Sequence, residues 1–468
     1  MAKAPWEAVP AHDTVFVLVT GANSGIGLGI CERLIDDFLA TRSLTSHLVV
    51  LPTTRSRSKS AETIALLRKH VVRAASSKTL VARGVTDPQD VISRIHISSV
   101  QLDLCDLSSV RRAAGQLVSS TVSFEGLGDL KLPRLDAVIF NAGIGGWSHI
   151  SWLGFAWDMI TRGWVQATTR PTFKRSTPGL TVAPLPGLQE TMGLVFCANV
   201  FGHYLLGHYI LPLITRPTSA AGQSDDNSAN LPSGRIIWQS SVDPTFCHFS
   251  LDDIQCLRNP TAYESSKILT DVLCLTAELP SVVPQSARYL ASAPPSIPTA
   301  AVSKPKLYVA HPGVVATTMF PLHFTLMWAY ILGVTLSRWL GSPWHPVTPY
   351  KGGSATVWLA LTSQAELDAE EAERCKWGSC TDFWGNSMVK KTEVDMWGWE
   401  GKAISASDMA QEDAGLIRVL KKSTGRSFNA QMPTKESITR FEETGAKCWA
   451  EMEKLRVEWE TKMAEAES

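Results

Sequence analysis

The stretch that decides the fold is VFVLVTGANSGIG, residues 15–27. A β-rich run leads into the turn Thr20-Gly21-Ala22-Asn23-Ser24-Gly25-Ile26-Gly27, and a helical stretch follows to about Leu39. In such a connection glycines let the backbone approach a pyrophosphate, and the helix N-terminus offers free N–H groups and the positive end of its dipole. The spacing G-x-x-x-G-x-G departs from the commoner G-x-G-x-x-G, and a glycine turn alone is also compatible with an ordinary strand–helix connection.

The same alternation of strand and helix continues beyond this turn. Helical patterns cover 61–73 and 108–119, and further strand-like runs occur at 47–51, 95–102, 136–143, 235–241 and 306–313. Strands separated by helix-length segments form βαβ units, and these build a parallel sheet covered on both faces. We therefore predict an α/β fold with a doubly wound parallel sheet of the Rossmann type.

The chain is longer than this pattern needs. We predict one α/β domain over 14–362 and a polar helical C-terminal extension over 363–468. The domain would carry insertions at 145–189, 215–233 and 280–305 and an apolar lid or anchor at 319–340. The first insertion holds four tryptophans, and the next two are polar or rich in Ala, Ser and Pro, which is typical of surface loops.

Composition excludes several classes of function. The 468 residues carry 44 basic and 44 acidic side chains, so broad electrostatic attraction to nucleic acid is not expected. The N-terminal segment has no apolar run that would predict a secretory signal. Nine scattered cysteines favour a reducing compartment, and the nearest pair, Cys375 and Cys380, lacks the companions of a zinc site. We predict no metal.

A second motif, Tyr263-Glu264-Ser265-Ser266-Lys267, places a phenol and an ammonium four residues apart. On a helix this spacing brings both groups to one face. A cation beside a tyrosine stabilises the phenolate and lowers the phenol's pKa towards the range of a general acid. In isolation the pattern is common and is usually a solvated helix face.

The order of the motifs along the chain is more specific than any one of them. After the glycine turn come Asn141-Ala142-Gly143, Asn199, Ser240-Ser241, the Tyr263/Lys267 pair and Pro312-Gly313. This series resembles the short-chain dehydrogenase/reductase family over roughly Val15 to Leu361. Phe140 is one departure, because the family often has a second asparagine before Asn-Ala-Gly.

The resemblance implies catalytic roles for four residues. Tyr263 would protonate the carbonyl oxygen as hydride arrives from a nicotinamide. Lys267 would lower the tyrosine pKa and hold the nicotinamide ribose. Ser241 would hydrogen-bond the substrate carbonyl, and Asn199 would order a water that relays protons to Lys267.

The identity of the serine has alternatives. The family's usual spacing to the tyrosine points to Ser250, and Ser240 is adjacent to Ser241. We favour Ser241 because it ends a strand and so reaches the carboxyl edge of the sheet, where ligands bind.

The resemblance also implies a cofactor site. Its expected residues are Thr20, Gly21, Ser24, Gly25, Ile26, Gly27, Leu28, Arg55, Asp103, Leu104, Asn141, Ala142, Gly143, Tyr263, Lys267, Val315 and Thr317. The second strand ends without an acidic residue for the ribose hydroxyls of NAD, and Arg55 and Arg57 follow it. Guanidinium groups suit a 2′-phosphate, so we predict NADP(H), with a basic surface loop as the alternative.

Several segments are similar to fungal 3-keto-steroid reductases, relatives of the mammalian type 7 17β-hydroxysteroid dehydrogenase. They are CANVFGHYLL (197–206), IIWQSSVDP (236–244), FSLDDIQ (249–255), TPYKGGSATVWLA (348–360) and KTEVDMWGWEG (391–401). The resemblance implies NADPH-dependent reduction of the C-3 ketone of a 4-methyl sterol to the 3β-alcohol, during C-4 demethylation towards ergosterol. The alternatives are a reductase of another lipid carbonyl, such as a 17-keto steroid or retinal, and a mainly structural subunit.

The apolar segment 319–340 suits a lipid substrate. Its uncharged core, 324–337, is shorter than the roughly 20 residues needed to cross a bilayer. We predict an interfacial anchor with Trp328, Trp339 and Trp344 near the headgroups, and the alternative is a lid or dimer face. The expected location is the cytosolic face of the endoplasmic reticulum or the lipid droplet, beside other C-4 demethylation enzymes. Trp147–Trp164 would form the other wall of the entrance or a satellite hydrophobic cluster.

Overall fold

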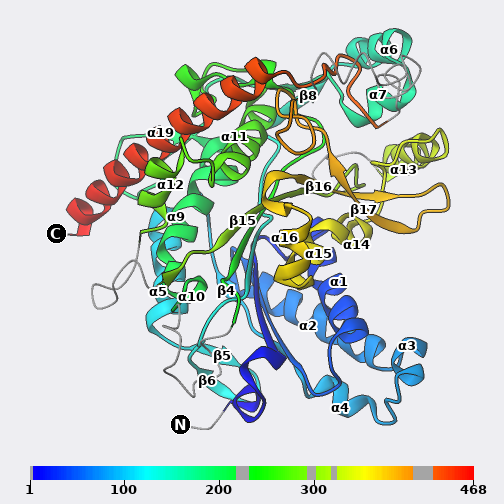
Figure 1. The fold of residues 1–468 in the computed structure, drawn as a ribbon, viewed down its shortest axis with the longest axis vertical. Helices are drawn as coiled ribbons and strands as arrows, with labels where there is room; N and C mark the ends of the chain where they lie inside the picture. The colour runs from blue at the N-terminus through cyan, green and yellow to red at the C-terminus, as the bar shows by residue number, and fades with distance from the viewer. Residues whose placement is uncertain (1–3, 218–230, 292–301, 318–323, 404–424, 468) are drawn as a thin grey trace.

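The computed structural model describes residues 4–217, 231–291, 302–317, 324–403 and 425–467. Its centre is a sheet with the strand order β17-β16-β15-β13-β7-β1-β2-β3, in which β4 also pairs with β2 (Figure 1). The strands are β1 (Thr14–Val19), β2 (His47–Thr54), β3 (Ile95–Ile97), β4 (Val100–Gln101), β7 (Ala137–Phe140), β13 (Arg235–Gln239), β15 (Lys306–His311), β16 (Lys376–Thr381) and β17 (Ser387–Thr392). All pairings are parallel except that of β16 with β17. This topology confirms the predicted doubly wound sheet.

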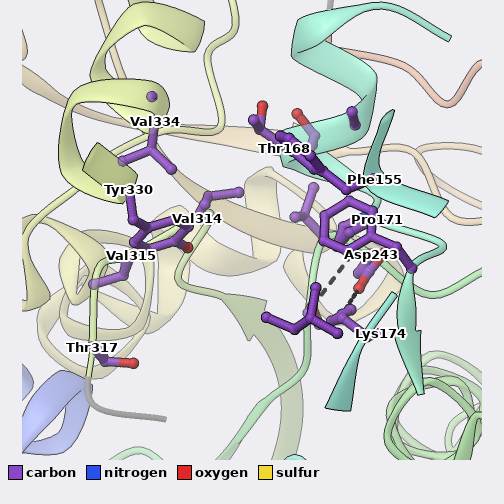
Figure 2. A pocket seen from close by; sticks show the side chains of 18 of the residues that line it. Phe155, Thr168, Pro171, Lys174, Asp243, Val314, Val315, Thr317, Tyr330 and Val334 are labelled. Atoms are coloured by element: carbon purple, nitrogen blue, oxygen red, sulfur yellow. Dashed lines mark hydrogen bonds and ion pairs between the residues drawn. The ribbon is translucent and has the colours of Figure 1, made fainter. Parts of the chain in front are cut away.

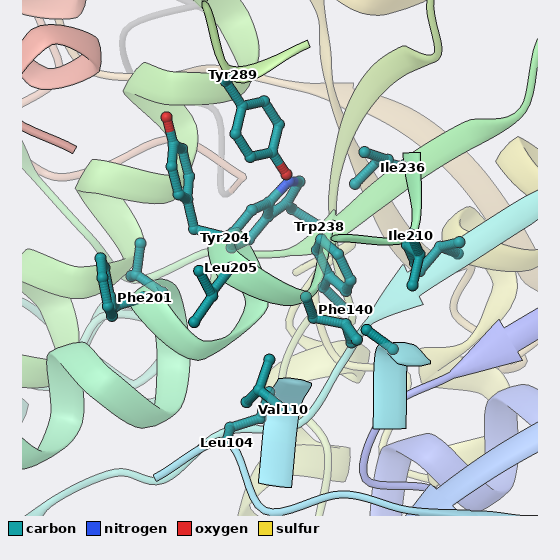
Figure 3. Close-up of a cluster of buried hydrophobic side chains, with 14 of the residues drawn as sticks. Leu104, Val110, Phe140, Phe201, Tyr204, Leu205, Ile210, Ile236, Trp238 and Tyr289 are labelled. Atoms are coloured by element: carbon teal, nitrogen blue, oxygen red, sulfur yellow. The ribbon is translucent and has the colours of Figure 1, made fainter. Parts of the chain in front are cut away.

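Both faces of the sheet are buried because helices cover each of them. In β1, Phe16 and Leu18 join one hydrophobic cluster, whereas Val17 and Val19 join the other, as the two-residue period of a strand requires. Figure 3 shows the first cluster, in which Phe140 packs against Trp238 with ring centroids 4.8 Å apart. The covering helices on the second cluster's face are α1 (Gly25–Thr41), α2 (Arg57–Ala75) and α15 (Ser354–Leu361), and the short helix α14 (Pro349–Gly352) packs against α1. Those on the first cluster's face are α5 (Leu107–Ser119), α9 (Gly202–Tyr209) and α11 (Ala262–Thr276).

Shorter elements decorate this framework. The further helices are α3 (Lys78–Ala82), α4 (Pro88–Ile92), α6 (Trp152–Thr161), α7 (Trp164–Thr169), α8 (Leu194–Phe196), α10 (Leu211–Ile214), α12 (Val283–Tyr289), α13 (Phe324–Trp339), α16 (Gln364–Ala369) and α19 (Lys435–Glu467). The two-stranded pairs are β5 (Val122–Phe124) with β6 (Gly128–Leu130), β8 (Trp147–Ile150) with β9 (Lys174–Ser176), β10 (Thr181–Val182) with β11 (Met192–Gly193), and β12 (Arg216–Pro217) with β14 (Val302–Ser303).

The insertion expected at 145–189 is an ordered unit in which the hairpin β8–β9 frames α6 and α7. In the other two expected insertions, at 215–233 and 280–305, residues 218–230 and 292–301 lie outside the described part of the chain. Their flanks form α12 and the β12–β14 pair. Residues 318–323 and 404–424 also lie outside the described part of the chain, so the apolar segment is described only from α13 onwards.

The segment after 362 is only partly helical. Helix α19 confirms the expected C-terminal helix, but 376–392, which we expected in the same extension, form β16 and β17 at the edge of the central sheet. The strand β16 reads KWGSCT, so it lacks the apolar run by which buried strands are found. Its Lys376 is nevertheless buried, because its ammonium pairs with Asp271 of α11 at 2.6 Å.

Candidate active site

The glycine turn lies between β1 and α1, at the carboxyl edge where the strand order reverses and doubly wound folds bind their ligands. Gly21 and Gly25 have φ of +64° and +56°, a region that other residues rarely adopt. A Cβ on Gly27 would lie 2.3 Å from the carbonyl oxygen of Gly21, so this position also requires glycine. The turn can therefore bring its backbone close to a ligand.

Thr20 connects this turn to the next strand of the sheet. Its hydroxyl accepts hydrogen bonds from the backbone N–H groups of Asn141 and Ala142, at 2.9 and 3.0 Å. The Asn141 side chain in turn donates to the Thr20 carbonyl at 3.0 Å. Thr20 is fully buried, so the structure shows it holding two loops together at the edge of the site.

The first of two cavities at this edge has a volume of about 400 Å³. Twelve of the residues expected at the cofactor line it, namely Gly21, Ser24, Gly25, Ile26, Gly27, Arg55, Asp103, Leu104, Asn141, Ala142, Gly143 and Thr317. Sequence reasoning missed others in the same wall, among them Asn23, Thr53, Cys105 and Ala198. The glycine cradle, the start of α1 and the long polar wall fit a dinucleotide.

Five expected cofactor residues lie elsewhere around this edge. Val315 and Tyr263 line the neighbouring cavity, and Leu28 packs against the hydrophobic cluster below α1. Lys267 and Thr20 are buried behind the cavity walls, and their described polar contacts are with protein groups. The cofactor cavity is thus built mainly from loops that follow β1, β2, β4 and β7.

The second cavity, about 410 Å³, is apolar (Figure 2). Its walls come from the 145–189 insertion, the end of β13, the loop after β15 and helix α13. They include Trp147, Trp152, Phe155, Trp164, Pro171, Val314, Val315, Tyr330 and Val334. Ile26 and Thr317 line both cavities, so a ligand in the apolar cavity would adjoin one end of a ligand in the polar cavity.

Tyr263 lies in the wall of the apolar cavity at the start of α11. Burial raises the pKa of Tyr263 to about 12, against the lowering effects of Lys174 and of a hydrogen bond with Ser241. Lys267 lies one helical turn later, with Nζ 5.7 Å from the centre of the tyrosine ring. Its ammonium donates to the Gln239 carbonyl at 2.7 Å, and burial lowers the pKa of Lys267 to about 8.

The three candidate serines occupy different environments. Ser241 follows β13, lines the apolar cavity and bonds to the Tyr263 hydroxyl. Ser240 is buried and its hydroxyl donates to the Lys267 carbonyl at 3.4 Å. Ser250 is exposed in the loop before α11. The geometry therefore favours Ser241 as the serine that can meet a ligand beside Tyr263.

Asn199 sits in a π-helical turn, Cys197–Phe201, inside a longer helical segment. Its side-chain oxygen accepts from the Ile144 N–H at 2.8 Å, and its amide donates to the Ile144 carbonyl at 3.1 Å. The amide also donates to the Ser266 hydroxyl at 3.1 Å. Asn199 thus fixes the loop after β7 against α11, and the water relay stays a prediction.

A buried ion cluster that sequence reasoning missed adjoins Tyr263. Lys174 of β9 pairs with Asp243 and, at 3.1 Å, with Glu264. Asp243 is two residues from Ser241, and Glu264 lies inside the Tyr-x-x-x-Lys motif, so both had a positional signal. Lys174 had none, because it lies about 90 residues earlier in an insertion.

Fold and site together define a class of protein. A dinucleotide cavity at the switch point of a parallel sheet meets an apolar cavity that holds a tyrosine, a serine and a nearby lysine. A buried phenol in that position can give a proton to a carbonyl oxygen. The fold and the site are those of a short-chain dehydrogenase/reductase, an oxidoreductase that acts on a ketone. Within the described residues, no cluster of His, Cys, Asp and Glu could hold a metal ion.

Comparison with known proteins gives the family. No protein-family model matches the chain. The 3-keto-steroid reductase of Gibberella zeae is 44% identical, covering 98% of this chain and 97% of that protein. That of Aspergillus fumigatus is 37% identical over 97% and 96% of the two chains, and that of Schizosaccharomyces pombe is 27% identical over 81% and 91%. The chain belongs to the 3-keto-steroid reductase family.

Solved structures of more distant proteins are also similar. Salutaridine reductase from Papaver somniferum is 17% identical with a TM-score of 0.39, covering 75% of this chain and 96% of that one. An actinorhodin polyketide ketoreductase variant with NADPH is 16% identical with a TM-score of 0.37, covering 76% and 94%.

Proposed function

We propose that this protein reduces the C-3 ketone of 4-methyl sterol intermediates to the 3β-alcohol with NADPH, during sterol C-4 demethylation towards ergosterol. The observation that carries the proposal is the junction of the two cavities at Ile26 and Thr317, with Tyr263 in the apolar wall. A sterol is a large apolar molecule with one polar end, and this cavity is mainly apolar but includes the polar side chains of Tyr263 and Ser241 in its wall. The name shared by the fungal relatives supports the same substrate class.

The proposed mechanism assigns one task to each polar group. Bound NADPH supplies the hydride. Tyr263 gives its phenolic proton to the carbonyl oxygen, and Ser241 donates a hydrogen bond to the same oxygen. Lys267 holds the ribose next to the nicotinamide and contributes positive charge beside the phenol. Asn199 holds the loop after β7 against α11, which fixes the position of the cofactor cavity relative to the catalytic residues of α11.

The choice of NADPH over NADH rests on Arg55. Strand β2 ends at Thr53 and Thr54, which line the cofactor cavity without a carboxylate, and Arg55 follows in the same wall. An exposed guanidinium at this point can form charge-assisted bonds to a 2′-phosphate. A hydroxyl-bearing ribose would find no acidic partner on this strand end.

The route by which the sterol arrives is proposed to be a lipid surface. Exposed apolar side chains occur on α6, on α13 and on the β16–β17 hairpin. These three elements project from the same side of the molecule (Figure 1). Trp328 of α13 is 70% exposed, Trp157 of α6 67% and Trp384 of the hairpin 81%. Trp164 donates to the Gly333 carbonyl at 3.0 Å, which ties α7 to α13 beside the cavity.

These helices are expected to lie on the membrane. Within the described residues, no helix combines the length and apolar character that crossing a bilayer requires. We propose peripheral binding at the cytosolic face of the endoplasmic reticulum or at lipid droplets, where the sterol and the other C-4 demethylation enzymes would be available. Tryptophans at the rim suit the headgroup region.

A substrate panel in one detergent tests the function. We expect NADPH oxidation with a 4-methyl-3-keto sterol at a higher kcat/KM than with a 17-keto steroid or retinal, and a higher kcat/KM with NADPH than with NADH. Tyr263→Phe is the control that separates chemistry from binding. Faster turnover of the 17-keto steroid or retinal would contradict the proposed substrate.

Flotation with phospholipid vesicles tests the surface. Trp328→Ser should reduce the bound fraction. Val457→Ser is the matched control, because Val457 is a 54% exposed apolar residue on α19, outside the proposed surface. Equal flotation of the wild type and both variants, or equal loss in both variants, would contradict a membrane contact through α13.

A further inference from the structure

Two buried ammonium groups lie close to the ring of Tyr263. The Nζ of Lys174 is 5.4 Å from the centre of its ring, and the Nζ of Lys267 is 5.7 Å from the same point. Lys174 also faces the ring of Trp147 at 4.6 Å, and Trp147 packs against Tyr263 with ring centroids 5.0 Å apart. The side chain of Lys174 is only 4% exposed. The resemblance to short-chain reductases predicts the second of these cations, and nothing in it predicts the first.

The position of Lys174 is fixed by secondary structure and by charge. It pairs with Ile150 across the β8–β9 hairpin, and Ser176 of the same strand bonds to the Pro260 carbonyl at 3.2 Å, just before α11. Its ammonium forms ion pairs with Asp243 and Glu264, whose side chains are 10% and 7% exposed. Figure 2 shows the dashed contact between Lys174 and Asp243 at the floor of the apolar cavity.

The two carboxylates keep this lysine charged. Burial alone would lower the pKa of Lys174, but Asp243 and Glu264 raise it above its ordinary value. Lys267 has a different environment, because burial lowers its pKa to about 8 against the opposing effect of Asp271. At neutral pH Lys174 is therefore protonated to a greater extent than Lys267.

Other charged and titratable groups face this cluster. Arg170 precedes β9, and its charge lowers the pKa of Asp243. Burial raises the pKa of Tyr330 of α13 to about 12, against the lowering effect of Lys174. At Tyr263 itself, Lys174 lowers the phenol's pKa, whereas Asp243 and Glu264 raise it. Within this cluster the lysine and the two carboxylates therefore have opposite effects on the pKa of the Tyr263 phenol.

We propose that Lys174 is a positioning residue of the reductase, which acts through Tyr263 by stabilising the tyrosinate that remains after proton transfer. The inference deepens the proposed function and rests on it. In the step concerned, hydride brings two electrons to the carbonyl carbon, the phenolic proton moves to the carbonyl oxygen, and the negative charge stays on the tyrosine oxygen until water returns a proton. Two cations then share that charge in a site of low dielectric.

A direct test measures ionisation at position 263 without any sterol. Fluorotyrosine in place of Tyr263 gives a more acidic phenol, whose ionisation ¹⁹F NMR follows in the full-length protein. We expect Lys174→Met to raise the pKa of this phenol by about one unit or more, as removal of an adjacent charge does. Lys174→Arg, which keeps the charge, should leave the value close to that of wild type. An unchanged value in Lys174→Met would overturn the proposal.

A second variant, Asp243→Asn, keeps the proposal testable if Lys174→Met does not fold. Asp243→Asn leaves Lys174 paired with Glu264 at 3.1 Å and should lower the phenol's pKa. A structural role alone would not move the two variants in opposite directions. An Asp243→Asn protein that folds and binds NADPH but shows no lowering would also overturn the proposal.

Kinetics provides the readout in the working enzyme. Because a general acid's efficiency follows its pKa with a slope below one, a phenol pKa raised by one unit in Lys174→Met should reduce kcat by up to about tenfold. The pH profile of kcat should move in the same direction as the NMR titration, and Lys174→Arg should restore it. If the protein failed to turn over sterols while the NMR titration still responded to Lys174→Met, the proposed substrate would fail and the role of Lys174 would stand.

Discussion

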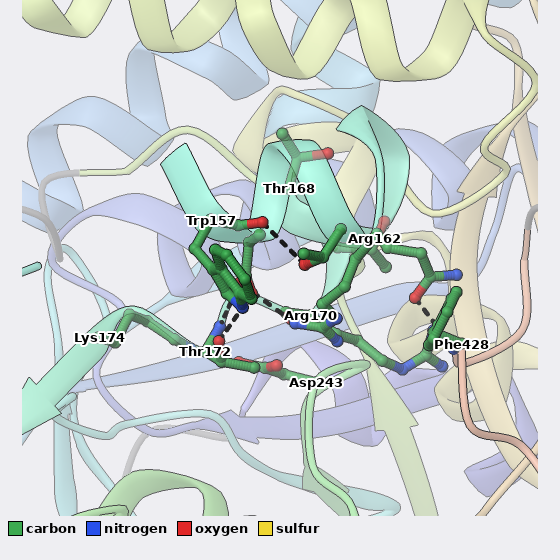
Figure 4. A network of polar contacts seen from close by, with 12 residues as sticks. Trp157, Arg162, Thr168, Arg170, Thr172, Lys174, Asp243 and Phe428 are labelled. Atoms are coloured by element: carbon green, nitrogen blue, oxygen red, sulfur yellow. Dashed lines mark hydrogen bonds and ion pairs between the residues drawn. The ribbon is translucent and has the colours of Figure 1, made fainter. Parts of the chain in front are cut away.

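Replacing Asp158 should destabilise the wall of the apolar cavity and leave the cofactor cavity unchanged. This residue is 1% exposed in α6, and its carboxylate accepts from the Thr172 N–H at 3.0 Å and the Thr172 hydroxyl at 2.8 Å. It also pairs with Arg162 at 3.1 Å. Figure 4 shows its partners Arg162 and Thr172 in one network of polar contacts. Asp158→Ala would remove all of these contacts, which join α6 to the segment just before β9.

The size of the effect follows from burial. Hydrogen bonds to a charged group contribute about 1.5–3 kcal/mol each, and breaking a buried ion pair by removing one partner costs about 3–5 kcal/mol. Arg162 keeps a second acceptor in the Arg170 carbonyl, at 2.9 Å, so we expect a loss near the lower end, about 3 kcal/mol. That loss is local to the unit that carries Phe155, Trp164 and Lys174 to the cavity wall.

The assay is hydrogen exchange together with steady-state kinetics. Exchange in 147–176 should rise by about two orders of magnitude, which corresponds to about 3 kcal/mol, and kcat/KM for the sterol should fall. The affinity for NADPH should not change, since the insertion's contribution to that cavity ends at Gly145. Asp158→Asn, which keeps an acceptor for Thr172, should be milder. If Asp158→Ala lost NADPH affinity by the same factor as it lost kcat/KM, the proposed independence of the two cavities would be refuted.

Three further outcomes are expected. Trp449→Ala should lower the free energy of unfolding by about 3–5 kcal/mol in denaturant titrations, because the ring is 1% exposed and its N–H donates to the Leu273 carbonyl at 3.1 Å. Arg55→Asp should weaken NADPH binding about tenfold or more and improve NADH binding, as measured by nucleotide fluorescence. A hydrogen bond to Asp36 raises the pKa of His70, so its stabilisation is full below the ordinary histidine pKa and is lost as pH rises through the raised value; His70→Gln should therefore be less stable than wild type only on the acidic side.

Local patterns in the sequence were sufficient for most of the fold. The apolar runs that became β1, β7 and β13 are fully or nearly fully buried, so their composition reports their place in the sheet. The glycine turn could also be predicted from the sequence, because few residues other than glycine adopt the positive φ found at Gly21 and Gly25. By contrast β16 contains lysine, serine and threonine, and only its pairing with α11 explains why it can be buried.

The same limit applies to the site. Tyr263 and Lys267 are four residues apart on one helix, so their proximity follows from helical geometry. Lys174 reaches Tyr263 only through the hairpin of an insertion, and no spacing rule connects 174 with 263. The hydrogen bonds of Asn199 to Ile144 likewise depend on how the loop after β7 meets a π-helical turn. Long-range contacts of this kind require the structure.

The central claim is that Tyr263 protonates a sterol C-3 ketone as hydride arrives from NADPH. The most direct measurement is a single turnover with a 4-methyl-3-keto sterol and NADPH deuterated at both C-4 positions of the nicotinamide, with the product analysed by mass spectrometry. The account predicts a 3β-alcohol with one deuterium at C-3, and in Tyr263→Phe a rate lower by about two to four orders of magnitude with NADPH binding retained. An undeuterated product, or a Tyr263→Phe rate equal to that of wild type, would contradict it.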